Sequence, residues 1–121
     1  MKLQLLSDLH IEVHPQLQIA PAAGADLLVL AGDIGSYQEG SRLVAPDFGL
    51  ARFSPRHGWP VPVIYVPGNH EYDNADFDEV HSRLRETCEA LEIGWLERET
   101  RTIDGVRFVG TTLWGGFRAL V

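Results

Sequence analysis

Residues 26–33 of this 121-residue chain read Asp26-Leu27-Leu28-Val29-Leu30-Ala31-Gly32-Asp33. An uninterrupted apolar run such as residues 27–31 is the pattern expected for a strand that is covered on both faces of a parallel sheet. The run ends at Gly32, where the backbone can turn sharply. The carboxylate of Asp33 then follows a buried strand, where it costs free energy unless a cation or several donors hold it. The segment therefore predicts a central strand with a charged site at its end.

Two more strands are predicted, one before and one after this segment, at residues 2–6 and 61–66. The earlier one ends at Ser7-Asp8-Leu9-His10 and the later one at Pro67-Gly68-Asn69-His70. Strands that alternate with crossover segments pair in parallel, and ligands bind at the carboxyl ends of such strands. The sequence thus predicts an α/β fold with polar side chains along one edge of a parallel sheet.

The crossovers differ in how clearly the sequence defines them. Residues 36–53 predict one short helix plus a loop, because Pro46 and Gly49 interrupt a weak helical pattern. Residues 74–93 predict the main helix, since apolar residues recur along one face at helical spacing. Asp76 suits the first turn of that helix, and Gly94 suits the position just after its end.

The last part of the chain predicts two further strands, at residues 95–99 and 106–111. Asp104-Gly105 is expected to form a hairpin turn between Thr102 and Val106. No repeat, low-complexity tract or interdomain linker is found, so we expect a single domain over residues 1–121.

The polar clusters at the predicted strand ends suggest a metal site. In an extended segment residues two apart point to the same side, so Asp8 and His10 can direct a carboxylate and an imidazole at one point. Asn69 offers a neutral carbonyl oxygen, and His70 an imidazole that can transfer protons near neutral pH. Each cluster alone also fits an ordinary cap or strand end. Their occurrence in order, each after a predicted strand, favours a shared site.

Three blocks of this sequence resemble the first three signature blocks of the calcineurin-like metallophosphoesterases: Asp8-x-His10, Gly32-Asp33 and Gly68-Asn69-His70-Glu71. The resemblance continues to about residue 117, because residues 110–114 are similar to a strand common in bacterial members. It implies the first half of an αββα sandwich, with a largely parallel sheet and crossover helices.

The resemblance also implies a role for each motif residue. Asp8 and His10 match ligands of a first metal, Asp33 matches the carboxylate that bridges two metals, and Asn69 matches a ligand of the second metal. His70 matches the histidine that lies beside the metals, contacts phosphate and protonates the leaving group. The expected cofactors are divalent metal ions, with manganese, iron or zinc favoured over calcium by mixed oxygen and nitrogen ligands.

The chain departs from the family pattern after these blocks. Family members are about twice as long, and their second half supplies a lone histidine and a Gly-His-x-His block, neither of which occurs here. The first metal would keep Asp8, His10 and Asp33, whereas the second would keep only Asp33 and Asn69. We therefore expect a truncated domain that holds one metal, against two in the complete family site.

Two functions from different classes follow from this. The first is a dinuclear metal-dependent phosphoester hydrolase acting on a small-molecule substrate. The alternative is a non-catalytic truncated chain or small binding module that holds at most one metal. A dinucleotide-binding domain is disfavoured because no Gly-x-Gly-x-x-Gly follows a strand.

Composition narrows the expected partners and location. The formal net charge of −7 argues against broad binding to nucleic acid or anionic membranes, although bound divalent cations would offset part of it near a phosphate. No apolar run approaches the roughly 18 residues that cross a bilayer, and the start lacks the pattern of a signal peptide. The only cysteine, Cys88, fits a reducing compartment, so a cytoplasmic protein is expected. A half-fold that ends near a strand such as residues 106–111 should also self-associate, because it would leave an unpaired sheet edge and an uncovered apolar face.

Several other polar and aromatic residues are interpreted as structural. Solvated or packing roles are favoured for the remaining histidines, His14, His57 and His81. Glu71 is expected to support its loop rather than to bind metal. Core packing by Trp114 is at least as plausible as contact with a substrate.

Overall fold

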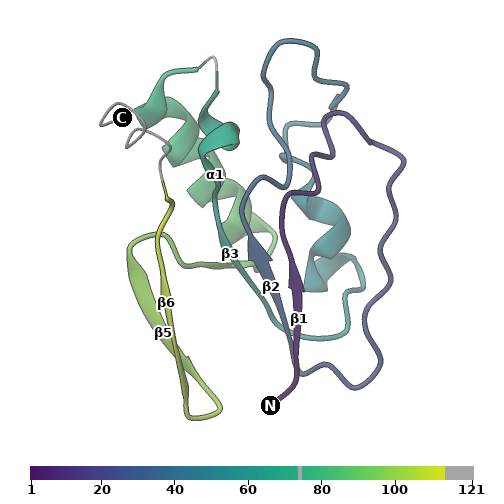
Figure 1. Cartoon of the computed structure of the whole chain (residues 1–121), viewed down its shortest axis with the longest axis vertical. Helices are drawn as coiled ribbons and strands as arrows, with labels where there is room; N and C mark the ends of the chain where they lie inside the picture. Colours follow the sequence, from purple (N-terminus) through teal and green to yellow (C-terminus); the bar gives the residue numbers. More distant parts are fainter. Residues whose placement is uncertain (74, 114–121) are drawn as a thin grey trace, which may run out of the picture.

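The computed structural model describes residues 1–73 and 75–113. Its main sheet has four parallel strands in the order β1-β2-β3-β4, with bounds Leu3–Leu6, Leu27–Ala31, Val63–Val66 and Gly94–Trp95. A separate antiparallel pair consists of β5 (Glu99–Ile103) and β6 (Val106–Gly110). The helical segments are η1 (Leu50–Phe53), η2 (Pro55–His57), η3 (Asn69–Tyr72) and α1 (Phe77–Ala90). Figure 1 shows the sheet with α1 on one side and the β5–β6 pair beyond β3.

The parallel α/β arrangement predicted from the three apolar runs is confirmed. Strands β1, β2 and β3 lie within the predicted ranges, and consecutive strands pair in parallel. The crossovers are less helical than expected, because among the described residues only the β3–β4 connection contains an α-helix. Residues 36–49 form turns and irregular backbone, and the short helix of the predicted range 36–53 is the 3₁₀ segment η1 at its end.

Helix α1 is shorter than the predicted range of residues 74–93. The Asp76 carboxylate accepts hydrogen bonds from the amides of Asp78 and Glu79, so Asp76 caps the helix instead of lying in its first turn. The left-handed residue after the helix is Glu92, with φ 56°, and Gly94 begins β4. The prediction for Gly94 was therefore wrong, and the expected start at residue 74 lies outside the described residues. In the part of the chain that the structure describes, no helix is long and apolar enough to cross a membrane.

The strand predicted at residues 95–99 is also wrong. The chain leaves the main sheet after Trp95, and β5 begins only at Glu99. The hairpin turn is confirmed, since Asp104 and Gly105 both have positive φ, as a two-residue turn of this kind requires. Ile103 rather than Thr102 precedes the turn, because Ile103 pairs with Val106.

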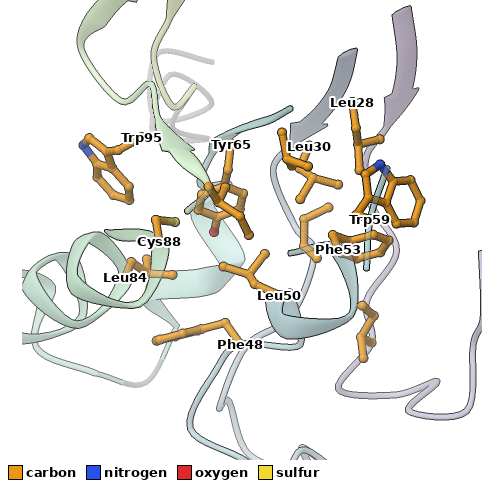
Figure 2. Packing of buried hydrophobic residues seen from close by; sticks show 14 of the residues in the cluster. Leu28, Leu30, Phe48, Leu50, Phe53, Trp59, Tyr65, Leu84, Cys88 and Trp95 are labelled. Atoms are coloured by element: carbon orange, nitrogen blue, oxygen red, sulfur yellow. The ribbon is translucent and has the colours of Figure 1, made fainter. Parts of the chain in front are cut away.

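The core lies on the face of the sheet that α1 and the 3₁₀ helices cover. Figure 2 shows Leu28 and Leu30 of β2 and Tyr65 of β3 facing Leu84 and Cys88 of α1. All five side chains are fully buried. Burial raises the pKa of the Cys88 thiol to about 12, which makes this cysteine an inert packing residue.

The opposite face of the sheet is covered only in part. Leu27 and Ile64 pack against Leu96 and against Phe108 of the β5–β6 pair. On the edge strand β1, the paired register places Leu3 and Leu5 on this same face, where they are 49% and 66% exposed. An apolar surface formed by Leu3 and Leu5 is thus open to solvent at the β1 edge of the described chain.

Candidate metal centre

The loops that follow β1 and β2 are joined by backbone hydrogen bonds. The amide of Asp8 donates to the carbonyl of Gly32, and the amide of His10 donates to the carbonyl of Asp33, both at 3.0 Å. Asp8, His10 and Asp33 all have left-handed backbones, with φ values of 56°, 47° and 52°. The expectation that Asp8 and His10 lie in an extended segment was therefore wrong. Three strained residues in one place are a feature of functional sites.

The loops after β2 and β3 approach each other through two glycines. A Cβ on Gly32 would lie 2.9 Å from the backbone of Gly68, and a Cβ on Gly68 would lie 2.1 Å from a carboxylate oxygen of Asp33. Such distances are too short for real atoms, so both positions need glycine. The contact holds the Asp33 loop against the Asn69 loop.

Three of the predicted metal ligands meet where these loops join. One ligand atom from each of Asp8, His10 and Asp33 lies within 4.8 Å of the other two. Asp8 and Asp33 also line a hollow of about 260 Å³, together with Asn69, the fourth predicted ligand. Thr111 and Leu113, after β6, line the same hollow. The structure thus brings residues from four separate loops to one edge of the sheet.

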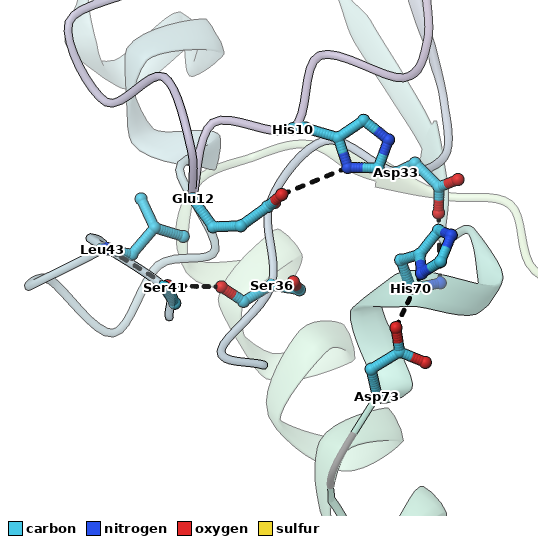
Figure 3. A network of polar contacts seen from close by, with 8 residues as sticks. All are labelled: His10, Glu12, Asp33, Ser36, Ser41, Leu43, His70 and Asp73. Atoms are coloured by element: carbon cyan, nitrogen blue, oxygen red, sulfur yellow. Dashed lines mark hydrogen bonds and ion pairs between the residues drawn. The ribbon is translucent and has the colours of Figure 1, made fainter. Parts of the chain in front are cut away.

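Neighbouring groups orient two of these side chains, as Figure 3 shows. The Nδ1 atom of His10 lies 3.1 Å from a carboxylate oxygen of Glu12. The amide of His70 donates to Oδ1 of Asp33 at 3.1 Å, which leaves the second oxygen of that carboxylate available. Two carboxylates and one oriented imidazole form a donor set that fits a divalent transition-metal ion.

His70 lies beside the cluster. Its ring centroid is 5.6 Å from that of His10, and its Nδ1 lies 2.6 Å from a carboxylate oxygen of Asp73. That hydrogen bond raises the pKa of His70, while burial opposes the rise and the charge of Asp33 adds to it. Because Nδ1 is engaged by Asp73, Nε2 is the nitrogen that remains for a ligand or substrate.

Glu71 is not a member of the cluster of candidate metal ligands. Its side chain is buried and accepts hydrogen bonds from the Tyr65 hydroxyl at 2.6 Å and from the Gly68 amide at 3.2 Å. Burial raises the pKa of Glu71 to about 8, although both hydrogen bonds oppose the shift. These contacts agree with the interpretation that Glu71 supports its loop.

The other histidines are not members of the cluster of candidate ligands. His14 and His57 are exposed, and His81 contacts the Tyr72 hydroxyl and the Trp95 ring. Trp114 lies outside the described residues. Sequence reasoning missed Glu12 and Asp73, the partners of the two site histidines. The signal was present in the short spacings from His10 to Glu12 and from His70 to Asp73.

Comparison with known proteins identifies the family to which the chain belongs. The family model described as calcineurin-like phosphoesterase matches residues 1–115. An uncharacterised protein of Acanthamoeba polyphaga mimivirus is 33% identical over 93 residues, which cover 72% of this chain and 31% of that protein. The chain therefore spans less than a third of the length of this curated relative. No solved structure gives a significant match. The family match, which covers nearly the whole chain, shows that this protein belongs to the calcineurin-like phosphoesterases.

Proposed function

We propose that this chain carries the first part of a metal-dependent phosphoester hydrolase site. The observation that carries the proposal is the meeting of Asp8, His10 and Asp33, whose ligand atoms lie within 4.8 Å of one another. Three good donors suffice to hold one divalent ion, with manganese, iron or zinc preferred by this mixed oxygen and nitrogen set. Membership of the calcineurin-like family supports phosphoester hydrolysis as the reaction.

Each site residue has a proposed task in that reaction. A divalent ion held by the cluster would supply Lewis acidity and would stabilise the charge of a bound phosphate. Asn69, which lines the hollow beside Asp8 and Asp33, would contribute its amide oxygen to a second ion. His70 would donate a proton through Nε2 to the departing oxygen, since Asp73 holds its other nitrogen.

The proposed substrate is a small phosphoester. The hollow at the cluster has a volume of about 260 Å³, which suits a phosphate group better than a large ligand. The formal net charge of −7 makes a nucleic acid a poor partner unless metal ions screen it.

Metal-dependent hydrolysis by the 121-residue chain tests this proposal. The protein is stripped with a chelator and reloaded with Mn²⁺, and hydrolysis of p-nitrophenyl phosphate and bis(p-nitrophenyl) phosphate is followed. We expect hydrolysis only after reloading and none above background in Asp8→Asn. Asp104→Asn makes the same chemical change in the hairpin turn, where asparagine is equally suitable, and should leave the rate unchanged.

The alternative function, a non-catalytic binding module that holds one metal, also has an observation in its favour. Among the described residues, Asp8, His10 and Asp33 are the one group of three or more acidic, histidine or cysteine side chains with metal-binding geometry. A chain with a single ion could bind metal without catalysing hydrolysis. Stoichiometric Mn²⁺ binding with no turnover of either ester would support this non-catalytic binding module, whereas absence of binding would contradict both functions.

We also propose that the chain self-associates through the apolar surface of Leu3 and Leu5. Edge strand β1 carries both residues, and exposed edges and apolar patches favour pairing with another chain. Light scattering should give a mass above the 13.5 kDa of one chain, and Leu5→Lys should lower it. Val44→Lys, at a position 98% exposed and outside the strands, is the matched control. A monomer with no exposed hydrophobic surface would contradict this proposal.

We propose that residues 1–121 belong to a single domain, which is supported by the shared use of β2 and β3 by the apolar clusters on both faces of the sheet. A cytoplasmic location is supported by the single cysteine, Cys88, which is buried as a free thiol.

A further inference from the structure

Glu12 is a buried carboxylate in a chain whose other acidic side chains are mostly exposed. It is 1% exposed, and its hydrogen-bonding partner is the imidazole of His10. Burying a carboxylate costs free energy unless it is paired, so a residue in this position needs a reason.

The backbone on both sides of Glu12 is held in place. The amide of Ile11 donates to the carbonyl of Ile34 at 2.8 Å, and the amide of Arg42 donates to the carbonyl of Glu12 at 2.8 Å. Ile11 is itself fully buried. The carboxylate of Glu12 is therefore presented to His10 from a fixed support, as the His10–Glu12 contact in Figure 3 illustrates.

The chemistry of the contact determines which nitrogen of His10 carries the proton. An ionised carboxylate only accepts hydrogen bonds, so Nδ1, which lies 3.1 Å from Glu12, must be the donor. In a neutral imidazole the other nitrogen, Nε2, is then bare and can bind a metal. A ligand histidine that donates its second nitrogen to a carboxylate is the arrangement that fixes ring orientation and raises ligand basicity.

We propose that Glu12 is the positioning residue of this metal centre, which holds His10 as the Nδ1-protonated tautomer with Nε2 directed to the ion. This inference rests on the proposed function, because it assumes that His10 is a ligand. It adds a residue that the three motif blocks do not contain.

Two measurements on the full chain test the role of Glu12. The first is the affinity for Co²⁺, whose visible absorption also reports its coordination. Loss of an outer partner of this kind typically costs about 10- to 100-fold in metal affinity, so we expect that loss in Glu12→Ala. Glu12→Gln retains an oxygen acceptor and should recover most of the affinity. The exposed Glu39→Gln makes the same chemical change and should have no effect.

The second measurement is long-range ¹⁵N NMR of His10 in the metal-free protein at about pH 8, where an ordinary imidazole is neutral. Wild type should show a protonated Nδ1 and a bare Nε2, and Glu12→Ala should lose this preference. A wild type with the proton on Nε2, or a Glu12→Ala variant with unchanged affinity and tautomer, overturns the inference. If wild type shows the expected tautomer but binds no Co²⁺, the proposed function fails while the orienting contact stands. If Glu12→Ala does not fold, the tautomer of His10 in wild type and the Co²⁺ affinity of Glu12→Gln still test the inference.

Discussion

Asp33→Asn should lose metal binding by more than about 100-fold, because a change in the ligand itself must exceed the 10- to 100-fold cost of losing an outer partner. The substitution keeps the size of the side chain and an oxygen that can accept the hydrogen bond from the His70 amide. It removes the negative charge that a divalent ion needs beside Asp8. Calorimetric titration with Mn²⁺ and metal analysis after dialysis would measure the loss.

A control variant and a measurement of folding show whether the loss of metal binding comes from the missing ligand. Asp104→Asn removes a charge at the hairpin turn and should bind metal as wild type does. Circular dichroism should show that Asp33→Asn retains its fold, since the backbone carbonyl still accepts from the His10 amide and the asparagine oxygen can accept from the His70 amide. Undiminished metal content in a folded Asp33→Asn protein would remove Asp33 from the ligand set.

In the complete form of the proposed enzyme, His70→Asn should slow hydrolysis of alkyl phosphates by about 10²- to 10⁴-fold, the usual contribution of a positioned general acid. An alkoxide leaves poorly without a proton, whereas nitrophenolate departs readily without one. The same variant should therefore lose far less activity toward nitrophenyl esters. Rates for the two substrates at matched metal occupancy give this contrast directly.

The competing interpretation of His70 is structural. Its amide and its Nδ1 both make hydrogen bonds that could simply support the loop, to Asp33 and Asp73. A supporting role predicts equal losses for both substrates together with a lower thermal stability. His57→Asn, at an exposed histidine, controls for the loss of an imidazole. Loss of bound metal in His70→Asn would instead make His70 a ligand.

The parallel strands could be predicted because each is an apolar run that stops at a motif. Burial on both faces leaves a continuous hydrophobic signal, as in β2. The hairpin strand β5 reads Glu-Thr-Arg-Thr-Ile and exposes most of its residues, so it lacks that signal. The strand predicted at residues 95–99 was wrong. Trp95 and Leu96 are buried in different clusters on opposite faces of the sheet. Tertiary packing, which a local pattern does not contain, decided that region.

The candidate site could be predicted in its membership but not in its geometry. The motif spacing indicated Asp8, His10 and Asp33, whereas their left-handed backbones depend on hydrogen bonds between loops that are distant in the sequence. The partners Glu12 and Asp73 were missed because an acidic residue near a histidine is usually a surface charge. Burial sets Glu12 apart from most acidic residues of the described chain, and the contact with His10 sets it apart from the other buried ones.

The contact between Gly32 and Gly68 limits how this sequence can vary. A side chain at either position would meet the backbone or the carboxylate of the opposite loop. A substitution at Gly32 cannot be rescued by making Gly68 smaller, because Gly68 already lacks a side chain, and a substitution at Gly68 would meet the backbone amide of Asp33 as well as its carboxylate. Any tolerated change would have to come from a shift of a whole loop, which would separate Asp33 from Asn69. The two positions therefore behave as a single constraint on sequence divergence for as long as both loops serve one site.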